Sequence, residues 1–120
     1  MADRAVPPRD IAPIDFFERW VPERVAGDES RRALLVDTRA VLEFWLDGDG
    51  GGHFTVEIAS GVVAGRRGPA EAADLRVLLD VETWRALNCG ELTAPEAFLR
   101  RRVRLEGNYA LAVKLHLILA

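Results

Sequence analysis

The side chains that could carry catalysis or bind a metal are few in this chain, and they are widely spaced. His53 and His116 are its two histidines, and Cys89 is its one cysteine. A protein metal site needs about three or four such ligands at short, regular spacings, which this pattern lacks. His53 and Glu57 share one face of an expected strand but stand about 13 Å apart, too far for a base and its orienting carboxylate. The pattern predicts no metal site, no catalytic residue and no cofactor.

Two further segments resemble reactive or phosphate-binding motifs. Cys89 stands at the expected end of a helix, whereas reactive thiolates are favoured at helix N-termini. We therefore expect Cys89 to be a small buried residue rather than a nucleophile. The glycine-rich run at residues 48–52 lacks the lysine and the following helix of a P-loop, so it predicts a hairpin turn.

The overall composition is that of one ordinary globular domain. The chain has 120 residues, of which 49% are hydrophobic and 29% charged, and its formal net charge is -3. A chain of this length can bury about two-thirds of its unfolded surface, enough for a core without disulfides. The negative charge argues against a nucleic-acid partner, because phosphate-binding domains carry a basic excess. The single cysteine fits a reducing compartment, so we expect a cytoplasmic location.

Few segments indicate contact with a membrane. The N-terminal residues have no apolar stretch of the kind found in signal peptides. The apolar run at residues 115–120 is far too short to span a bilayer, so we expect no stable membrane insertion. Arg100–Arg102 and Arg104 form the one basic cluster, which we interpret as a solvated helix end. A weak contact with anionic membrane surfaces is the alternative.

Hydrophobic periodicity divides the chain into a tail and one domain. Residues 1–10 hold two prolines among charged residues and predict a flexible tail, so the domain spans residues 11–120. A helix is predicted with Asp15 as its N-cap, and Pro22 is expected to kink or restart it. The apolar face of this helix, at three- and four-residue spacing, carries Phe16, Phe17, Trp20 and Val21.

The apolar period then changes to two, which predicts strands. They are expected, in chain order, at residues 36–46, 53–59, 62–66, 74–81 and 102–106. The first two form a hairpin around the glycine-rich turn. Two short helices precede the last strand, one capped by Thr83 and one beginning at Thr93–Pro95, and a final helix carries Leu111, Leu115 and Ile118.

One face of the expected sheet is apolar and the other is mixed, so helices should cover one face and water the other. The mixed face carries Arg39, Glu43, Glu57, Arg76, Asp80, Arg104 and Glu106. Val41, Trp45 and Leu78 interrupt these charges. They form one patch only if the strand with Leu78 lies close to the first hairpin. Because contiguous apolar patches often mark interfaces, we expect a weak homodimer through this face.

An ordered set of motifs over residues 11–120 resembles the sterol carrier protein type 2 family, the SCP-2 sterol-transfer domains. The motifs are Phe17-x-x-Trp20-x-Pro22-Glu23-Arg24, Val41-Leu42-Glu43-Phe44, Phe54-Thr55-Val56, Ala73-Asp74-Leu75-Arg76-Val77, Trp84-x-x-Leu87-x-x-Gly90-x-Leu92-x-x-x-x-Ala97-Phe98 and Val103-Arg104-Leu105-Glu106-Gly107-Asn108. Two positions depart from the family pattern. Arg101-Arg102 stand where a glycine usually precedes the last strand, and Gly107-Asn108 stand in place of Gly-Asp.

The resemblance implies an α/β fold of the α+β type. Its five-stranded, mostly antiparallel sheet has helices on one face, and sheet and helices enclose a hydrophobic tunnel. It also implies non-specific binding of sterols, fatty acids or acyl-CoAs. From the shared inner faces of five elements, we expect the tunnel to be lined by Phe16, Trp20, Leu42, Phe44, Phe54, Val56, Val77, Leu79, Trp84, Phe98, Leu111 and Leu115.

We therefore expect a bacterial-type domain that binds or transfers an apolar ligand without catalysis. A small biosynthetic enzyme on the same fold is the first alternative, because a fold does not fix a function. It would need a polar residue inside the tunnel, for which the candidates are Thr38, Asn88, Tyr109 and His116. The second alternative is an interaction module whose cavity has collapsed.

Overall fold

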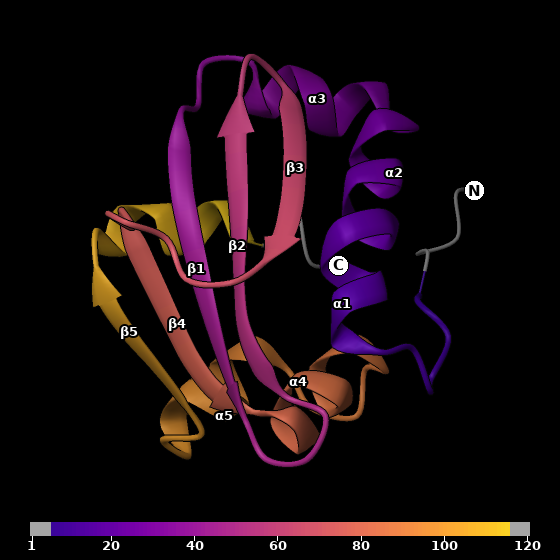
Figure 1. Ribbon diagram of the computed structural model, residues 1–120, viewed down its shortest axis with the longest axis vertical. Helices are drawn as coiled ribbons and strands as arrows, with labels where there is room; N and C mark the ends of the chain where they lie inside the picture. The colour runs from indigo at the N-terminus through magenta and orange to yellow at the C-terminus, as the bar shows by residue number, and fades with distance from the viewer. Residues whose placement is uncertain (1–5, 116–120) are drawn as a thin grey trace.

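The computed structural model describes residues 6–115, and its centre is a five-stranded sheet (Figure 1). The strand order is β3-β2-β1-β4-β5. The strands are β1 Ala40–Asp47, β2 Gly52–Ala59, β3 Val62–Arg67, β4 Leu75–Asp80 and β5 Val103–Gly107. Only the central β1–β4 pair is parallel, and the other three pairs are antiparallel. The predicted five-stranded, mostly antiparallel sheet of an α+β fold is therefore confirmed.

Helical segments cover one face of this sheet. They are α1 Pro13–Asp15, η1 Phe16–Trp20, α2 Val21–Ala26, α3 Glu29–Leu35, α4 Val81–Asn88, α5 Ala94–Leu99 and η2 Tyr109–Lys114. In the view of Figure 1, α4 and α5 lie behind the sheet, and the run from α1 to α2 lies beside β3. The helical segments thus form two groups. The run from α1 to α2 lies over the β3 side of the sheet, and α4 and α5 lie over the rest.

The N-terminal helix differs from the prediction at its start and agrees with it at Pro22. It begins at Pro13 with Ala12 as N-cap, and no side chain caps it, so the assignment of Asp15 as N-cap was wrong. The α-helix restarts as α2 beside Pro22, after a wider π-helical turn in which the Val21 N–H donates to the Phe16 carbonyl. Pro22 then falls in the first turn of α2, where its missing N–H costs little.

The prediction missed α3 and began the first strand too early. Asp28 is the N-cap of α3, and its carboxylate accepts a hydrogen bond from the Arg31 backbone N–H at 3.1 Å. Leu35 is the buried residue of this helix, and β1 starts only at Ala40. Val36 and Thr38 fit the alternating pattern of the strand, but they lie in a turn and in the connection that follows it.

The caps of the later helices explain where they begin. Asp80, not Thr83 as predicted, is the N-cap of α4, and its carboxylate accepts from the Thr83 backbone N–H at 2.6 Å. That hydrogen bond holds the pKa of Asp80 below its ordinary value. The predicted start of α5 is confirmed: Thr93 and Glu96 form a capping box with proline in the first turn.

The final helical segment is shorter and tighter than predicted. Within the described residues it is the 3₁₀ helix η2, and the Asn108 side chain caps it by accepting from the Ala110 backbone N–H. The predicted continuation of this helix through His116 and Ile118 lies outside the described residues.

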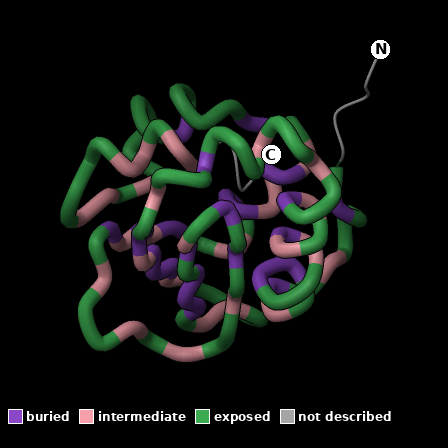
Figure 2. Tube along the Cα trace, turned by 90° about the horizontal axis from the view of Figure 1, so that it is seen from above, coloured by how far each residue is buried: buried purple, intermediate pink, exposed green. Residues whose placement is uncertain are grey.

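Aromatic side chains fill the interior between the N-terminal helix and the sheet. The Phe17 ring lies 4.8 Å from the Phe44 ring and 5.0 Å from the Phe54 ring. In Figure 2 the buried residues gather between the helical segments and the sheet. Gly65 of β3 allows this close approach, because a Cβ there would stand 1.9 Å from the Phe17 carbonyl oxygen.

The opposite face of the sheet carries an ion pair between a buried carboxylate, Glu43, and the half-buried Arg76. Glu43 points away from the helices yet is only 1% exposed, because the segment 68–74 crosses this face (Figure 1). It accepts hydrogen bonds from Arg76 Nε at 2.8 Å and from the Ala70 backbone N–H at 3.1 Å. Burial alone would raise the pKa of Glu43, but hydrogen bonds led by that of Arg76 outweigh it and hold the pKa below its ordinary value.

The residues of the expected dimer patch lie on the same outer face. Trp45 and Leu78 are register partners on β1 and β4, so the condition that their strands be adjacent is met. The Trp45 ring is stacked on the His53 ring at 4.3 Å, and the Arg76 guanidinium lies 4.7 Å from its centroid. These neighbours cover part of the apolar surface of Trp45. The weak homodimer stays a prediction.

We predict that Gly65→Ala destabilises the fold. The new methyl group would meet the Phe17 backbone carbonyl, which can move away only if the helix moves. Overpacking of this kind costs about 1–3 kcal/mol, which urea unfolding followed by tryptophan fluorescence would detect. Ala64→Ser, at the exposed neighbouring position, is the control and should leave the midpoint unchanged. Equal midpoints for both variants would contradict this packing of the helix on β3.

We also predict that Glu43→Gln lowers stability at neutral pH by about 2 kcal/mol, since a charged hydrogen bond to Arg76 is lost. The pKa of Glu43 is depressed in the fold, so its carboxylate contributes stability above the unfolded-state pKa. That contribution disappears as the pH falls through the folded-state pKa. The wild type and the variant should therefore converge in acid. A difference that does not depend on pH would show that the charge of Glu43 is not what stabilises the fold.

Candidate functional site

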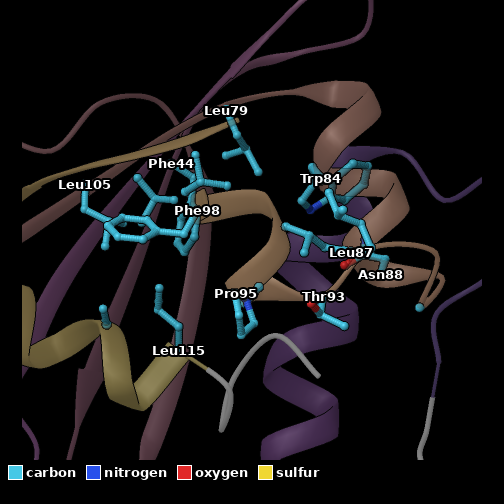
Figure 3. A pocket seen from close by; sticks show the side chains of 16 residues that line it. Phe44, Leu79, Trp84, Leu87, Asn88, Thr93, Pro95, Phe98, Leu105 and Leu115 are labelled. Atoms are coloured by element: carbon cyan, nitrogen blue, oxygen red, sulfur yellow. The ribbon is translucent and has the colours of Figure 1, made fainter. Parts of the chain in front are cut away.

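A cavity of about 640 Å³ lies between the sheet and the helical segments α4, α5 and η2 (Figure 3). Ligand sites for small molecules commonly have about 300–1,000 Å³. Its described wall is mostly apolar and contains no ionisable side chain. The lining residues are Phe44, Val77, Leu79, Trp84, Leu87, Asn88, Gly90, Leu92, Thr93, Ala94, Pro95, Phe98, Val103, Leu105, Ala112 and Leu115.

The floor of the cavity is the inner face of β1, β4 and β5. Phe44 is the register partner of Val77, and Val77 is the partner of Leu105 on the next strand. Leu79 and Val103 form the adjacent pair. Because side chains alternate between the faces of a strand, the pairing places all five on one side.

The roof of the cavity is made by short helices and their connections. Trp84, Leu87 and Asn88 are spaced three and four residues apart on α4, so they share one face. Gly90 ends this helix with φ +76°, a conformation that glycine adopts without strain. The chain then turns into α5, which adds Phe98.

One side of the cavity reaches the surface beside α5. Several lining residues at the end of α4 and the start of α5, Gly90, Thr93, Ala94 and Pro95, are exposed. Phe98 lines the cavity although it is 58% exposed, which differs from the inner, buried position expected for it. The short α5 helix therefore forms an edge between the cavity and the solvent. The resemblance implied a tunnel at this place. The structure has a cavity there, and a continuous tunnel stays a prediction.

Half of the twelve residues expected to line a ligand site surround this cavity. They are Phe44, Val77, Leu79, Trp84, Phe98 and Leu115. Phe16, Leu42, Phe54 and Val56 instead fill the core beneath the N-terminal helix, fully buried. Trp20 is half-buried and stacks on Phe16 at 5.3 Å, and Leu111 packs half-buried against the core. Contact with a ligand stays a prediction for all twelve.

Sequence reasoning missed ten of the lining residues, and some of them had a usable signal. Leu87 and Asn88 follow Trp84 at helical spacing, and Val103 and Leu105 alternate on β5. The stretch from Gly90 to Pro95 had no such signal, because its apolar residues follow neither a helical nor a strand spacing.

The polar residues considered for a catalytic tunnel are scattered. Asn88 lines the cavity, and Tyr109 is exposed on η2. Thr38 precedes β1 and does not line the cavity, and His116 lies outside the described residues. Within residues 6–115, no group of three or more His, Cys, Asp or Glu side chains is arranged to hold a metal ion.

The arginines near α5 pair with neighbouring carboxylates at the surface. Arg104 lies 3.0 Å from Glu106, and Arg100 lies 3.6 Å from Glu96. These exposed pairs fit the interpretation of a solvated cluster. Across residues 6–115, no helix is both long and apolar enough to cross a bilayer.

The described fold and cavity define a small α+β domain with an apolar interior site. Residues 21–120 match the SCP-2 sterol transfer family, so the chain belongs to this family of lipid-binding and lipid-transfer domains. The resemblance inferred from the sequence motifs is confirmed.

Similar proteins place this domain in chains of different lengths. Hydroxysteroid dehydrogenase-like protein 2 of Rattus norvegicus is 30% identical over 93 residues, which cover 77% of this chain but 18% of the rat protein. The chain thus spans about a fifth of that relative's length. The sec-alkylsulfatase Pisa1 from Pseudomonas sp. has a TM-score of 0.73 at 23% identity, over 93% of this chain and 17% of that one. Palmitated SCP2L2 from Aedes aegypti has a TM-score of 0.62 at 18% identity, over 85% and 89%. Both structures share the fold.

Cys89 is not the buried residue that we expected. It is half-buried at the C-cap of α4 and does not line the cavity, although Asn88 and Gly90 on either side of it do. We predict that a thiol reagent modifies Cys89 in the native protein and that Cys89→Ala changes the unfolding free energy by less than about 1 kcal/mol. Mass spectrometry and urea unfolding would measure both effects. Modification that requires denaturant would place the thiol in the core after all.

Proposed function

We propose that this domain binds an apolar ligand in the cavity and carries or transfers it without catalysis. The ligand is a sterol, a fatty acid, an acyl-CoA or a similar hydrophobic metabolite. The observation that supports this most directly is the wall of the cavity, which is apolar on the side of the sheet and on the side of the helices. The cavity size suits one such molecule.

The binding energy would come from burial of the ligand's hydrocarbon surface. Apolar surface removed from water contributes about 25 cal/mol per Å², so a ligand that buries about 300 Å² would gain roughly 7–8 kcal/mol. Association entropy offsets part of this gain. A wall without charges has little means of selecting one hydrocarbon shape over another, which favours a broad range of ligands.

Two further observations support the proposal. The Aedes aegypti protein was solved in a palmitated form, which supports a long acyl chain as one class of ligand. The exposed position of Phe98 and the loop before α5 offers a route for a ligand between solvent and cavity. We place the domain in the cytoplasm, which its single cysteine favours, and we propose no nucleic-acid partner, in keeping with its net negative charge.

A second candidate function is suggested by the longer relatives. The rat protein is named as dehydrogenase-like and Pisa1 as an alkylsulfatase. The chain matches less than a fifth of the length of each. An enzyme on this fold, acting on a hydrophobic substrate, would need a polar group in the cavity, and Asn88 meets that requirement. A collapsed interaction module fits less well, because the interior holds an open cavity.

We predict saturable, one-to-one binding of a fluorescent fatty acid by the wild type and its loss in Leu115→Arg. Leu115 lines the cavity, so a guanidinium there would occupy apolar space and bring water with it. Val113→Arg is the matched control, because Val113 lies on the same segment, is exposed and does not line the cavity. Absence of binding by the wild type, or equal effects of the two arginines, would overturn the proposed site.

A further inference from the structure

We propose that the ligand carries an uncharged hydrogen-bond acceptor, such as the carbonyl of a ketone, ester or amide, and that Asn88 and Trp84 bind this oxygen. The proposal rests on the proposed function, since it describes the polar end of the same ligand. It adds a selectivity that an apolar cavity alone would lack.

The first support is a pair of unsatisfied donors. The side-chain nitrogens Nδ2 of Asn88 and Nε1 of Trp84 are buried, and neither has a hydrogen-bond partner in the described structure. Asn88 is 7% and Trp84 3% exposed, and both line the cavity. Buried donors nearly always have partners in native proteins, and leaving one unpaired is costly. A bound acceptor would supply the missing partner.

The second support is that the two donors share one place. Trp84 and Asn88 are four residues apart on α4, so their side chains are neighbours on one helix face, about 5–6 Å apart at Cβ. Figure 3 shows both at the α4 end of the cavity, across from Leu105 and Leu115. The Trp84 ring is held by an edge-to-face contact with Phe16 at 5.3 Å. An oxygen bound at this end would lie beside both residues while the hydrocarbon extends towards β5 and η2.

The third support is the absence of a countercharge. No lining residue in the described structure is ionisable. Arg85, the cation next to Trp84, lies over the ring and donates to the backbone carbonyl of Ile11. A carboxylate at the α4 end would be buried without a cation, which is strongly unfavourable. A neutral carbonyl needs only donors, and those are what the site has.

The other polar side chain of the wall is already engaged. The Thr93 hydroxyl donates to the Glu96 carboxylate at 3.1 Å and accepts from the Glu96 backbone N–H, as part of the cap of α5. Thr93 is also exposed, at the edge of the cavity. It therefore offers the ligand less than Asn88 or Trp84.

The test compares three ligands of equal chain length by displacement of a fluorescent fatty acid at neutral pH: dodecan-2-one, dodecanoate and dodecane. We expect the ketone to bind at least about tenfold more tightly than the other two. Asn88→Leu, which has nearly the same size, should weaken the ketone about tenfold and leave dodecane unchanged or tighter. Trp84→Phe should act in the same direction. Tyr109→Phe, at an exposed position that does not line the cavity, should alter none of the three affinities, and thermal unfolding of every variant checks its fold.

Two kinds of outcome would overturn the proposal, and they are distinguishable from each other. If the wild type binds all three ligands equally, or if Asn88→Leu weakens all three alike, the domain is a carrier without this polar contact. Tighter binding of dodecanoate than of the ketone has the same meaning. If the wild type binds none of the three, the proposed function fails together with the inference.

Discussion

The interior of this domain depends on how the apolar face of one sheet is divided between two sets of helices. The N-terminal helix can lie directly on β3 because Gly65 has no side chain, and the rings of Phe16 and Phe17 then fill the space over β1 and β2. Apolar surface on β4 and β5 is left for α4, α5 and η2. These segments are short, and they cover the surface without filling the space beneath it.

This division explains why the cavity lies where it does. Dense packing and a binding cavity are opposite demands on one hydrophobic face, since interiors normally contain few voids. Here the two are separated along the sheet. The aromatic residues over β1 and β2 pack closely and stabilise the fold. The aliphatic residues of β4 and β5, among them Val77, Leu79 and Leu105, form the floor of the cavity. Phe44 belongs to both, because it touches Phe17 on one side and lines the cavity on the other.

The outer face fixes the strands that carry this floor. Arg76 of β4 is held by Glu43 of β1 and by Glu106 of β5, across both neighbouring strands. A shift of one residue in register would turn every side chain of β4 to the other face. The charged cluster on the outer face therefore helps to hold Val77 and Leu79 on the inner one.

The sequence carried enough information to predict the sheet, because side-chain alternation in Leu42 and Phe44, or in Val77 and Leu79, depends only on the local chain. The run Thr93-Ala94-Pro95-Glu96, with proline in the first turn, also predicted the start of α5. It did not separate the aromatic residues that fill the core from those that line a cavity. That distinction depends on how closely a helix approaches a distant strand, which a single glycine decides. The burial of Glu43 was equally hidden, since it requires a loop to cross the outer face.

The proposed ligand site is the half of the interior beneath α4 and α5. The most direct measurement is an isotope-filtered NOE experiment on methyl-labelled protein saturated with an unlabelled alkyl ligand. We expect contacts from the ligand to the methyl groups of Leu79 and Leu105 and none to those of Leu42 and Val56. Contacts to Leu42 and Val56, or only to the exposed Leu99 on α5, would contradict it.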